Sequence, residues 1–60
     1  MTELSADAAR RLAAFLEALT KASRETNVSI AGGSWLEIDG GADGHVEQNA
    51  DGEYVYRSAQ

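Results

Sequence analysis

The sequence predicts an α+β protein, with one long N-terminal amphipathic helix packed on a small three-stranded antiparallel β-meander. In the first half, apolar residues recur every three or four positions, as they do along one face of a helix. In the second half, short apolar stretches alternate with glycine and acidic residues, which is typical of strands joined by turns. The chain has 60 residues. We therefore expect residues 1–60 to form a single domain with a small core.

The helix is predicted over residues 6–26. Ser5 is the expected N-cap because its hydroxyl can accept from a free amide one turn later, and Asn27 suits the left-handed position that ends a helix. Asp7 is favourable in the first turn, near the positive end of the helix dipole. The apolar stripe comprises Ala8, Leu12, Phe15, Leu16, Leu19 and Ala22. The expected ion pairs join Asp7 with Arg11, Glu17 with Lys21, and Lys21 with Glu25.

The first strand is predicted in two pieces, residues 28–30 and 34–38, with Gly32 and Gly33 forming a break or bulge between them. Successive side chains of a strand point to opposite faces. Leu36 and Ile38 therefore share one face, and Trp35 and Glu37 share the other. Because Leu36 and Ile38 are apolar, we expect the helix to cover their side of the sheet.

The other two strands are predicted over residues 45–48 and 53–57, and residues 39–44 form a loop by composition. Residues 49–52 suit a type I turn that ends with Gly52 in the left-handed region. This hairpin places Val46 opposite Tyr56, Gln48 opposite Tyr54, and Val55 on the other face with Glu47. The predicted core contains Leu12, Phe15, Leu16, Leu19, Leu36, Ile38, Val46 and Tyr56, and the helix lies over Tyr54 as well.

Composition excludes several classes of function. The net charge is −5, and residues 29–60 hold six acids and only one base, Arg57. A surface that binds the phosphates of a nucleic acid duplex would be basic. No apolar stretch approaches the length of a membrane span, and no signal peptide is recognisable. With no cysteine, we expect a cytoplasmic protein without disulfides.

Neither a metal site nor an active site can be assembled from the sequence. Residues 39–50 resemble a calcium-binding loop in part, but Gly41 and Ala50 occupy two of the ligand positions. His45 lies near Asp43 and Glu47, yet a single histidine beside a turn makes no catalytic group. No nucleophile with a base, carboxylate pair in an apolar cleft or phosphate loop is present. We therefore expect no enzymatic activity, no metal and no cofactor.

Self-association is expected because a chain of this length buries only about 60% of its extended surface. A helix of 21 residues spans about 30 Å, whereas a five-residue strand spans about 17 Å. Part of the apolar stripe should therefore extend beyond the sheet. A homodimer or a higher closed oligomer would cover this overhang, or else the outer sheet face that carries Trp35.

The segments 15–24, 28–30 and 32–37 (FLEALTKASR, VSI and GGSWLE) resemble a group of small phage and prophage accessory proteins. These proteins have a helix that ends in a Leu-Thr-x-x-Ser-like segment, then a short β stretch, glycines and an aromatic–Leu pair. The resemblance covers residues 12–38, and the cysteines common in such relatives are missing here. It implies a phage-encoded factor in the host cytoplasm, where counter-defence is a frequent role. It carries over no functional residue.

Two binding functions remain open, and the sequence slightly favours the first, because glycine, aromatic and arginine residues are the types that such a pocket needs. In the first, an oligomer sequesters a small anionic ligand, such as a nucleotide-type immune signal, between subunits. Glycine amides would approach the anion, aromatic rings would stack on a base, and arginines would supply positive charge. The candidate residues are Gly32, Gly33, Ser34, Trp35, Tyr54, Arg57, Arg10, Arg11 and Arg24. In the second, the Trp35 side of the sheet docks on a host protein and inhibits it, with the acidic hairpin against a basic surface.

Overall fold

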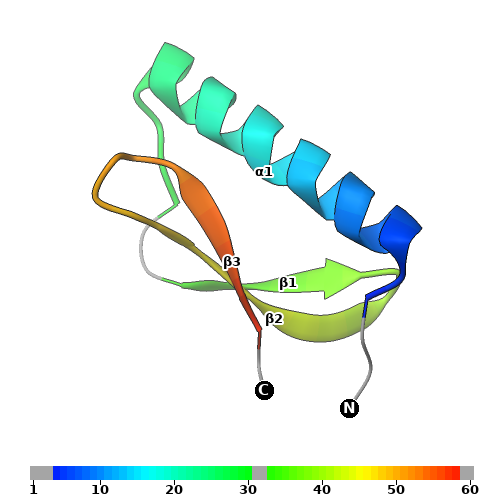
Figure 1. The fold of residues 1–60 in the computed structure, drawn as a ribbon. Coiled ribbons are helices and arrows are strands. Elements are labelled where there is room, and N and C mark those ends of the chain that lie inside the picture. The colour runs from blue at the N-terminus through cyan, green and yellow to red at the C-terminus, as the bar shows by residue number, and fades with distance from the viewer. Residues whose placement is uncertain (1–3, 31–32, 59–60) are drawn as a thin grey trace.

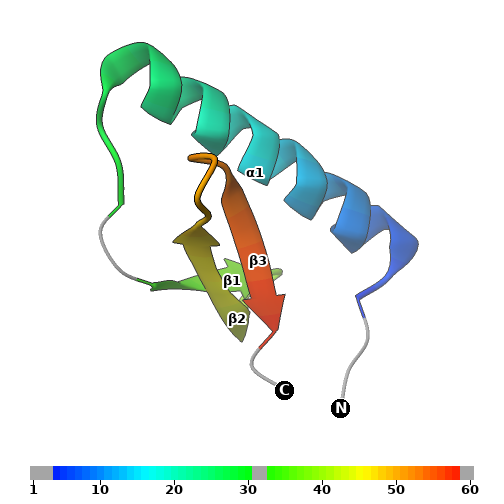
Figure 2. The ribbon, with the colours of Figure 1, turned by 60° about the vertical axis from the view of Figure 1, so that its left-hand side comes forward.

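A computed structural model describes residues 4–30 and 33–58, and in it one helix lies across one face of a three-stranded antiparallel sheet (Figures 1 and 2). The fold is α+β, as predicted. The elements in chain order are α1 (Ala6–Thr26), β1 (Ser34–Ile38), β2 (Gly41–Gln48) and β3 (Tyr54–Ser58). The strand order in the sheet is β1-β2-β3, which is a meander.

Helix α1 begins and ends where the sequence predicts. The Ser5 hydroxyl accepts a hydrogen bond from the Ala8 amide at 3.0 Å. Asn27 has a φ of 59°, and its N–H donates to the Ser23 carbonyl at 2.8 Å. Both ends are thus capped by short-range bonds. The Asp7–Arg11 ion pair forms at 2.9 Å. The two pairs predicted for Lys21 are absent from the described part of the chain.

Two sequence predictions in the β region are wrong. Residues 28–30 are not a strand, because they belong to no ladder of paired strands. The Ile30 N–H instead donates to the side-chain hydroxyl of Tyr54 at 2.8 Å. Residues 39–44 are not a loop, because Asp39 and Gly40 alone reverse the chain and β2 begins at Gly41. Their φ values of 54° and 87° are both left-handed, which is the geometry of a tight two-residue hairpin turn.

The β2–β3 hairpin has the predicted turn and register. The Asn49 N–H donates to the Glu53 carbonyl at 2.9 Å, and Gly52 has a φ of 83°. Val46 pairs with Tyr56, and the two neighbouring pairs, Glu47 with Val55 and Gln48 with Tyr54, also match the prediction. The register between β1 and β2 shifts after Leu36, so that β2 carries a bulge there.

Gly44 is buried in the middle of β2, where only glycine fits. A Cβ at this position would lie 2.3 Å from the Arg57 carbonyl oxygen and 2.8 Å from Cε1 of Tyr56. Tyr56 is half-buried, and its ring therefore occupies the space above the glycine. An aromatic side chain commonly covers a strand glycine in this way.

The core lies where α1 crosses β2 and β3, and it is small. The buried apolar residues are Ala8, Val46 and Tyr54, with exposed fractions of 4%, 3% and 4%. Thr20 is also buried, and its Oγ1 accepts from the Tyr54 N–H at 2.9 Å, which ties the helix to β3. The other predicted core residues are half-buried, except Phe15, which is 49% exposed. Placing Phe15 in the core was wrong because it lies at the edge of the covered helix face.

The helix spans the sheet from one turn to the other. Arg11 bonds to Asp39 at the β1–β2 turn, and Arg24 donates to the Asp51 carbonyl at the β2–β3 turn at 3.3 Å. Because β2 has eight residues, it extends about 27 Å, close to the length of the helix. The predicted overhang at the helix end is therefore wrong. On the helix itself, the large apolar side chain that stays exposed is Phe15, on one flank of α1.

Candidate interaction surface

The face of the sheet turned away from the helix carries alternate side chains of all three strands. In β1 the residues alternate between half-buried and exposed, so that Leu36 faces the helix and Trp35 faces away. Trp35 pairs with His45, and His45 pairs with Arg57. These three residues thus form one row across the outer face. We call this surface the Trp35 face: Trp35, Glu37, His45, Glu47, Val55 and Arg57.

The aromatic part of the Trp35 face is built by three neighbouring residues. Trp35 is 67% exposed, and its ring centroid lies 6.3 Å from that of His45, with an interplanar angle of 77°. This edge-to-face arrangement is a favoured one for aromatic rings. A Cβ on Gly33 would lie 3.0 Å from Cδ2 of His45. Gly33 therefore leaves room for the His45 ring, which in turn supports Trp35.

The charged part of the Trp35 face lies on β2 and β3. The Arg57 Nε donates to a Glu47 carboxylate oxygen, and both side chains are partly exposed. Glu37 is exposed on β1. The Trp35 face therefore combines a prominent indole with two carboxylates and one guanidinium that already has a partner.

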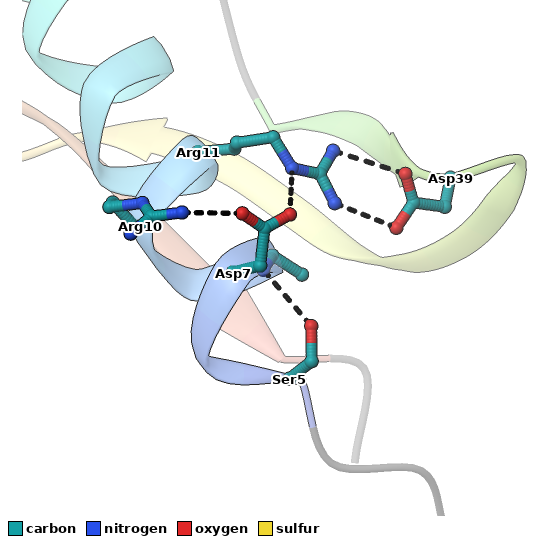
Figure 3. A network of polar contacts seen from close by, with 6 residues as sticks. Ser5, Asp7, Arg10, Arg11 and Asp39 are labelled. Carbon is teal, nitrogen blue, oxygen red and sulfur yellow. Dashed lines mark hydrogen bonds and ion pairs between the residues drawn. The ribbon is translucent and has the colours of Figure 1, made fainter.

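Arg10 and Arg11, at the start of the helix, belong to a separate network of polar contacts (Figure 3). Asp7 accepts from Arg10 at 2.6 Å and from Arg11 at 2.9 Å. Arg11 also donates to both carboxylate oxygens of Asp39, at 3.1 and 2.9 Å. This guanidinium holds the pKa of Asp39 below its usual value, and the two carboxylates raise the pKa of Arg11.

The structure separates most of the residues predicted to bind a small anion. Trp35 and Arg57 are on the Trp35 face, and Gly33 lies beside it, next to the His45 ring. Ser34, in contrast, faces the helix side of the sheet, opposite Val46. Gly32 lies outside the described residues. Tyr54 is buried, and its hydroxyl accepts from Ile30, so its ring is not available for stacking.

The predicted basic residues do not converge within one chain. Arg10 and Arg11 lie at the start of α1 and are engaged by acids. Arg24 lies 13 residues further along the helix, about 20 Å away. His45 and Glu47, which the sequence placed near a turn, belong instead to the interaction surface. Alternate residues of paired antiparallel strands share one face of the sheet, and this pattern could have placed His45 and Glu47 beside Trp35.

Comparison with models of known protein families, with curated proteins and with solved structures found no match. Over residues 4–30 and 33–58, no helix has the length and apolar character needed to cross a membrane. No cluster of three or more metal-ligating side chains occurs in the part of the chain that the structure describes.

Proposed function

We propose that this is a small non-enzymatic binding protein that docks on another protein through the Trp35 face. The observation that carries the proposal is an indole that is 67% exposed on the outer face of the sheet and in edge-to-face contact with the His45 ring. Tryptophan is enriched among residues that dominate binding energy, because it buries a large rigid area at little entropic cost. An exposed indole with a fixed orientation is suited to enter an apolar pocket of a partner.

The charges favour a partner with a basic rim around that pocket. The Trp35 face has two carboxylates against one guanidinium, and the whole segment 29–60 has six acids against one base. Complementary charge on two proteins speeds their association and helps each to discriminate against wrong partners. In this proposal the partner is a host protein, in keeping with the resemblance to phage accessory proteins, and docking inhibits it.

A nucleotide-type ligand has less support from the geometry. An anion at Arg10, Arg11 or Arg57 would compete with a carboxylate that already holds the guanidinium. The buried ring of Tyr54 offers no stacking platform. The residues that the hypothesis requires would have to come together from different subunits.

The test is affinity capture from a bacterial lysate followed by titration of the captured protein after purification. Trp35→Ala should weaken binding at least about 30-fold, which corresponds to the loss of a binding hot spot of about 2 kcal/mol. Val28→Ala is the matched control, because Val28 is 68% exposed but lies outside the sheet. Equal binding by wild type and Trp35→Ala would reject the proposal.

A second measurement separates the two functions. Mono-, di- and cyclic nucleotides are screened for thermal stabilisation of the wild-type protein. A ligand at a hundred times its dissociation constant would stabilise the fold by about 2.7 kcal/mol. We expect no shift; a shift with one nucleotide would favour ligand capture instead.

A further inference from the structure

The two edges of the sheet differ in how they are covered. At β3 the helix lies beside the edge, and the Tyr54 N–H is bonded to Thr20. At β1 no group outside the sheet bonds to the main chain of Trp35 or Glu37 in residues 4–30 and 33–58. An uncovered strand edge is a template for another strand. The β1 sequence, SWLEI, contains none of the lysines or prolines that commonly prevent such pairing.

The hydrogen-bond alternation identifies which groups of β1 point outward. The bond from the Asn49 N–H to the Glu53 carbonyl shows that the odd-numbered residues at this end of the hairpin bond toward β3. The even-numbered residues of β2 therefore bond toward β1, where Ser34 and Leu36 are their partners. The N–H and C=O groups of Trp35 and Glu37 consequently face the open edge.

The open edge adjoins apolar surface on the helix side of the sheet. A groove of about 290 Å³ separates α1 from β1. Its lining includes Leu12, Phe15, Leu36 and Ile38, and Phe15 is 49% exposed.

A strand that pairs with the open edge of β1 and brings apolar side chains of its own would cover both the edge and the groove. We propose that a second copy of the chain covers them by pairing its β1 antiparallel to this one, about a twofold axis at Leu36. The β1 strand has both features that this requires, outward main-chain groups at Trp35 and Glu37 and apolar residues Leu36 and Ile38 beside the groove. The two sheets then become one continuous sheet. The two grooves and the two Phe15 side chains lie along the joint on the helix side.

The register follows from charge and from strand length. A twofold axis at Glu37 would place two carboxylates directly opposite each other, which is destabilising. An axis at Trp35 would place Ile38 opposite a position that precedes the first residue of β1 in the second copy, so Ile38 would have no strand partner. An axis at Leu36 pairs all five residues of β1, with Trp35 opposite Glu37 of the second copy. On the outer face the two Trp35 residues become diagonal neighbours, about 7–8 Å apart, so that the dimer doubles the Trp35 face.

Cross-linking tests the register, because the chain contains no cysteine of its own. Opposed Leu36 residues form a non-hydrogen-bonded pair with Cα atoms about 4.5 Å apart, within disulfide range. Leu36→Cys should therefore yield a covalent dimer under mild oxidation. Glu37→Cys is the matched control. In this register each Glu37 lies opposite Trp35 of the second copy, so the two Glu37 positions are offset by two residues. Their Cα atoms are then farther apart than the roughly 7 Å within which a disulfide can form.

Sedimentation equilibrium tests the dimer without a cross-link. Wild type should have twice the monomer mass of 6.4 kDa in the micromolar range. Added salt should strengthen association, because it screens repulsion between two chains of net charge −5. Glu37→Pro removes an outward N–H from each copy, so the dimer loses two hydrogen bonds across the joint. Association should weaken at least about tenfold. Glu37→Ala keeps the N–H and should not weaken association.

Three results would overturn the inference. They are a wild-type mass of 6.4 kDa throughout that range, an equally tight dimer with Glu37→Pro, and faster cross-linking at position 37 than at 36. Circular dichroism of each variant verifies that it is folded. Because no partner protein is used, these results are separate from the test of the Trp35 face.

Discussion

The bond between the Thr20 hydroxyl and the Tyr54 N–H is the most informative single contact to perturb. It joins the middle of α1 to the first residue of β3 at 2.9 Å, between residues 34 positions apart in the chain. Both residues are buried, with exposed fractions of 9% and 4%. Thr20→Val keeps the shape of the side chain and removes the acceptor, so it leaves a buried amide without a partner.

The expected cost is about 1–3 kcal/mol, the desolvation penalty of an unpaired buried donor. A chain of 60 residues has a total stability of only about 3–9 kcal/mol. Each kcal/mol should lower Tm by about 4–8 °C for a domain of this size. Thr20→Ser is the matched control, because it keeps the hydroxyl and loses one methyl group, worth about 0.8 kcal/mol.

Urea unfolding followed by far-ultraviolet circular dichroism measures both variants. Protein concentration is held constant, since association would shift the midpoint. We expect Thr20→Val to be less stable than Thr20→Ser, with equal denaturant slopes. If valine is tolerated as well as serine or better, the hydrogen bond does not hold the helix to the sheet.

Three further predictions use the same unfolding measurement. Gly44→Ala should lower the free energy of unfolding by about 1–3 kcal/mol, because its Cβ would collide with the backbone of β3. Gly33→Ala should lower it less, since the His45 ring can move. Equal losses of stability in the two variants would contradict this. Tyr54→Phe should lower the free energy of unfolding by about 0.5–1.5 kcal/mol, because it removes the hydroxyl that accepts from the Ile30 N–H. An unchanged urea midpoint would show that water replaces this hydroxyl at no cost. Asp39→Asn keeps the turn but loses the charge that Arg11 engages. Because the folded pKa of Asp39 is lowered, its contribution is present above the unfolded pKa of about 3.9 and is lost as pH falls through the folded value. The difference between wild type and Asp39→Asn should therefore shrink below about pH 4, and a constant difference down to about pH 2 would refute the role of the ion pair.

The sequence alone determined the elements whose stability is local. Ser5 and Asn27 cap the helix through bonds that reach three or four residues, so both ends could be placed from residue type. The turn at 49–52 sets the register of the last two strands for the same reason. The Asp39–Gly40 turn was also predictable, since this dipeptide is a strong hairpin signal. It was missed because the glycine-rich composition of residues 39–44 was interpreted as a loop.

Only the tertiary structure decided which side chains are covered. Periodicity assigned Phe15 to the apolar stripe and gave Thr20 no role, yet Phe15 is half exposed and Thr20 is buried. The angle at which α1 crosses the sheet sets this difference, and that angle depends on contacts between residues far apart in the chain. The same long-range geometry engages Arg11 with Asp39, buries Tyr54 and leaves the edge of β1 open. The candidate surface therefore follows from how the helix lies on the sheet, which hydrophobic periodicity does not specify.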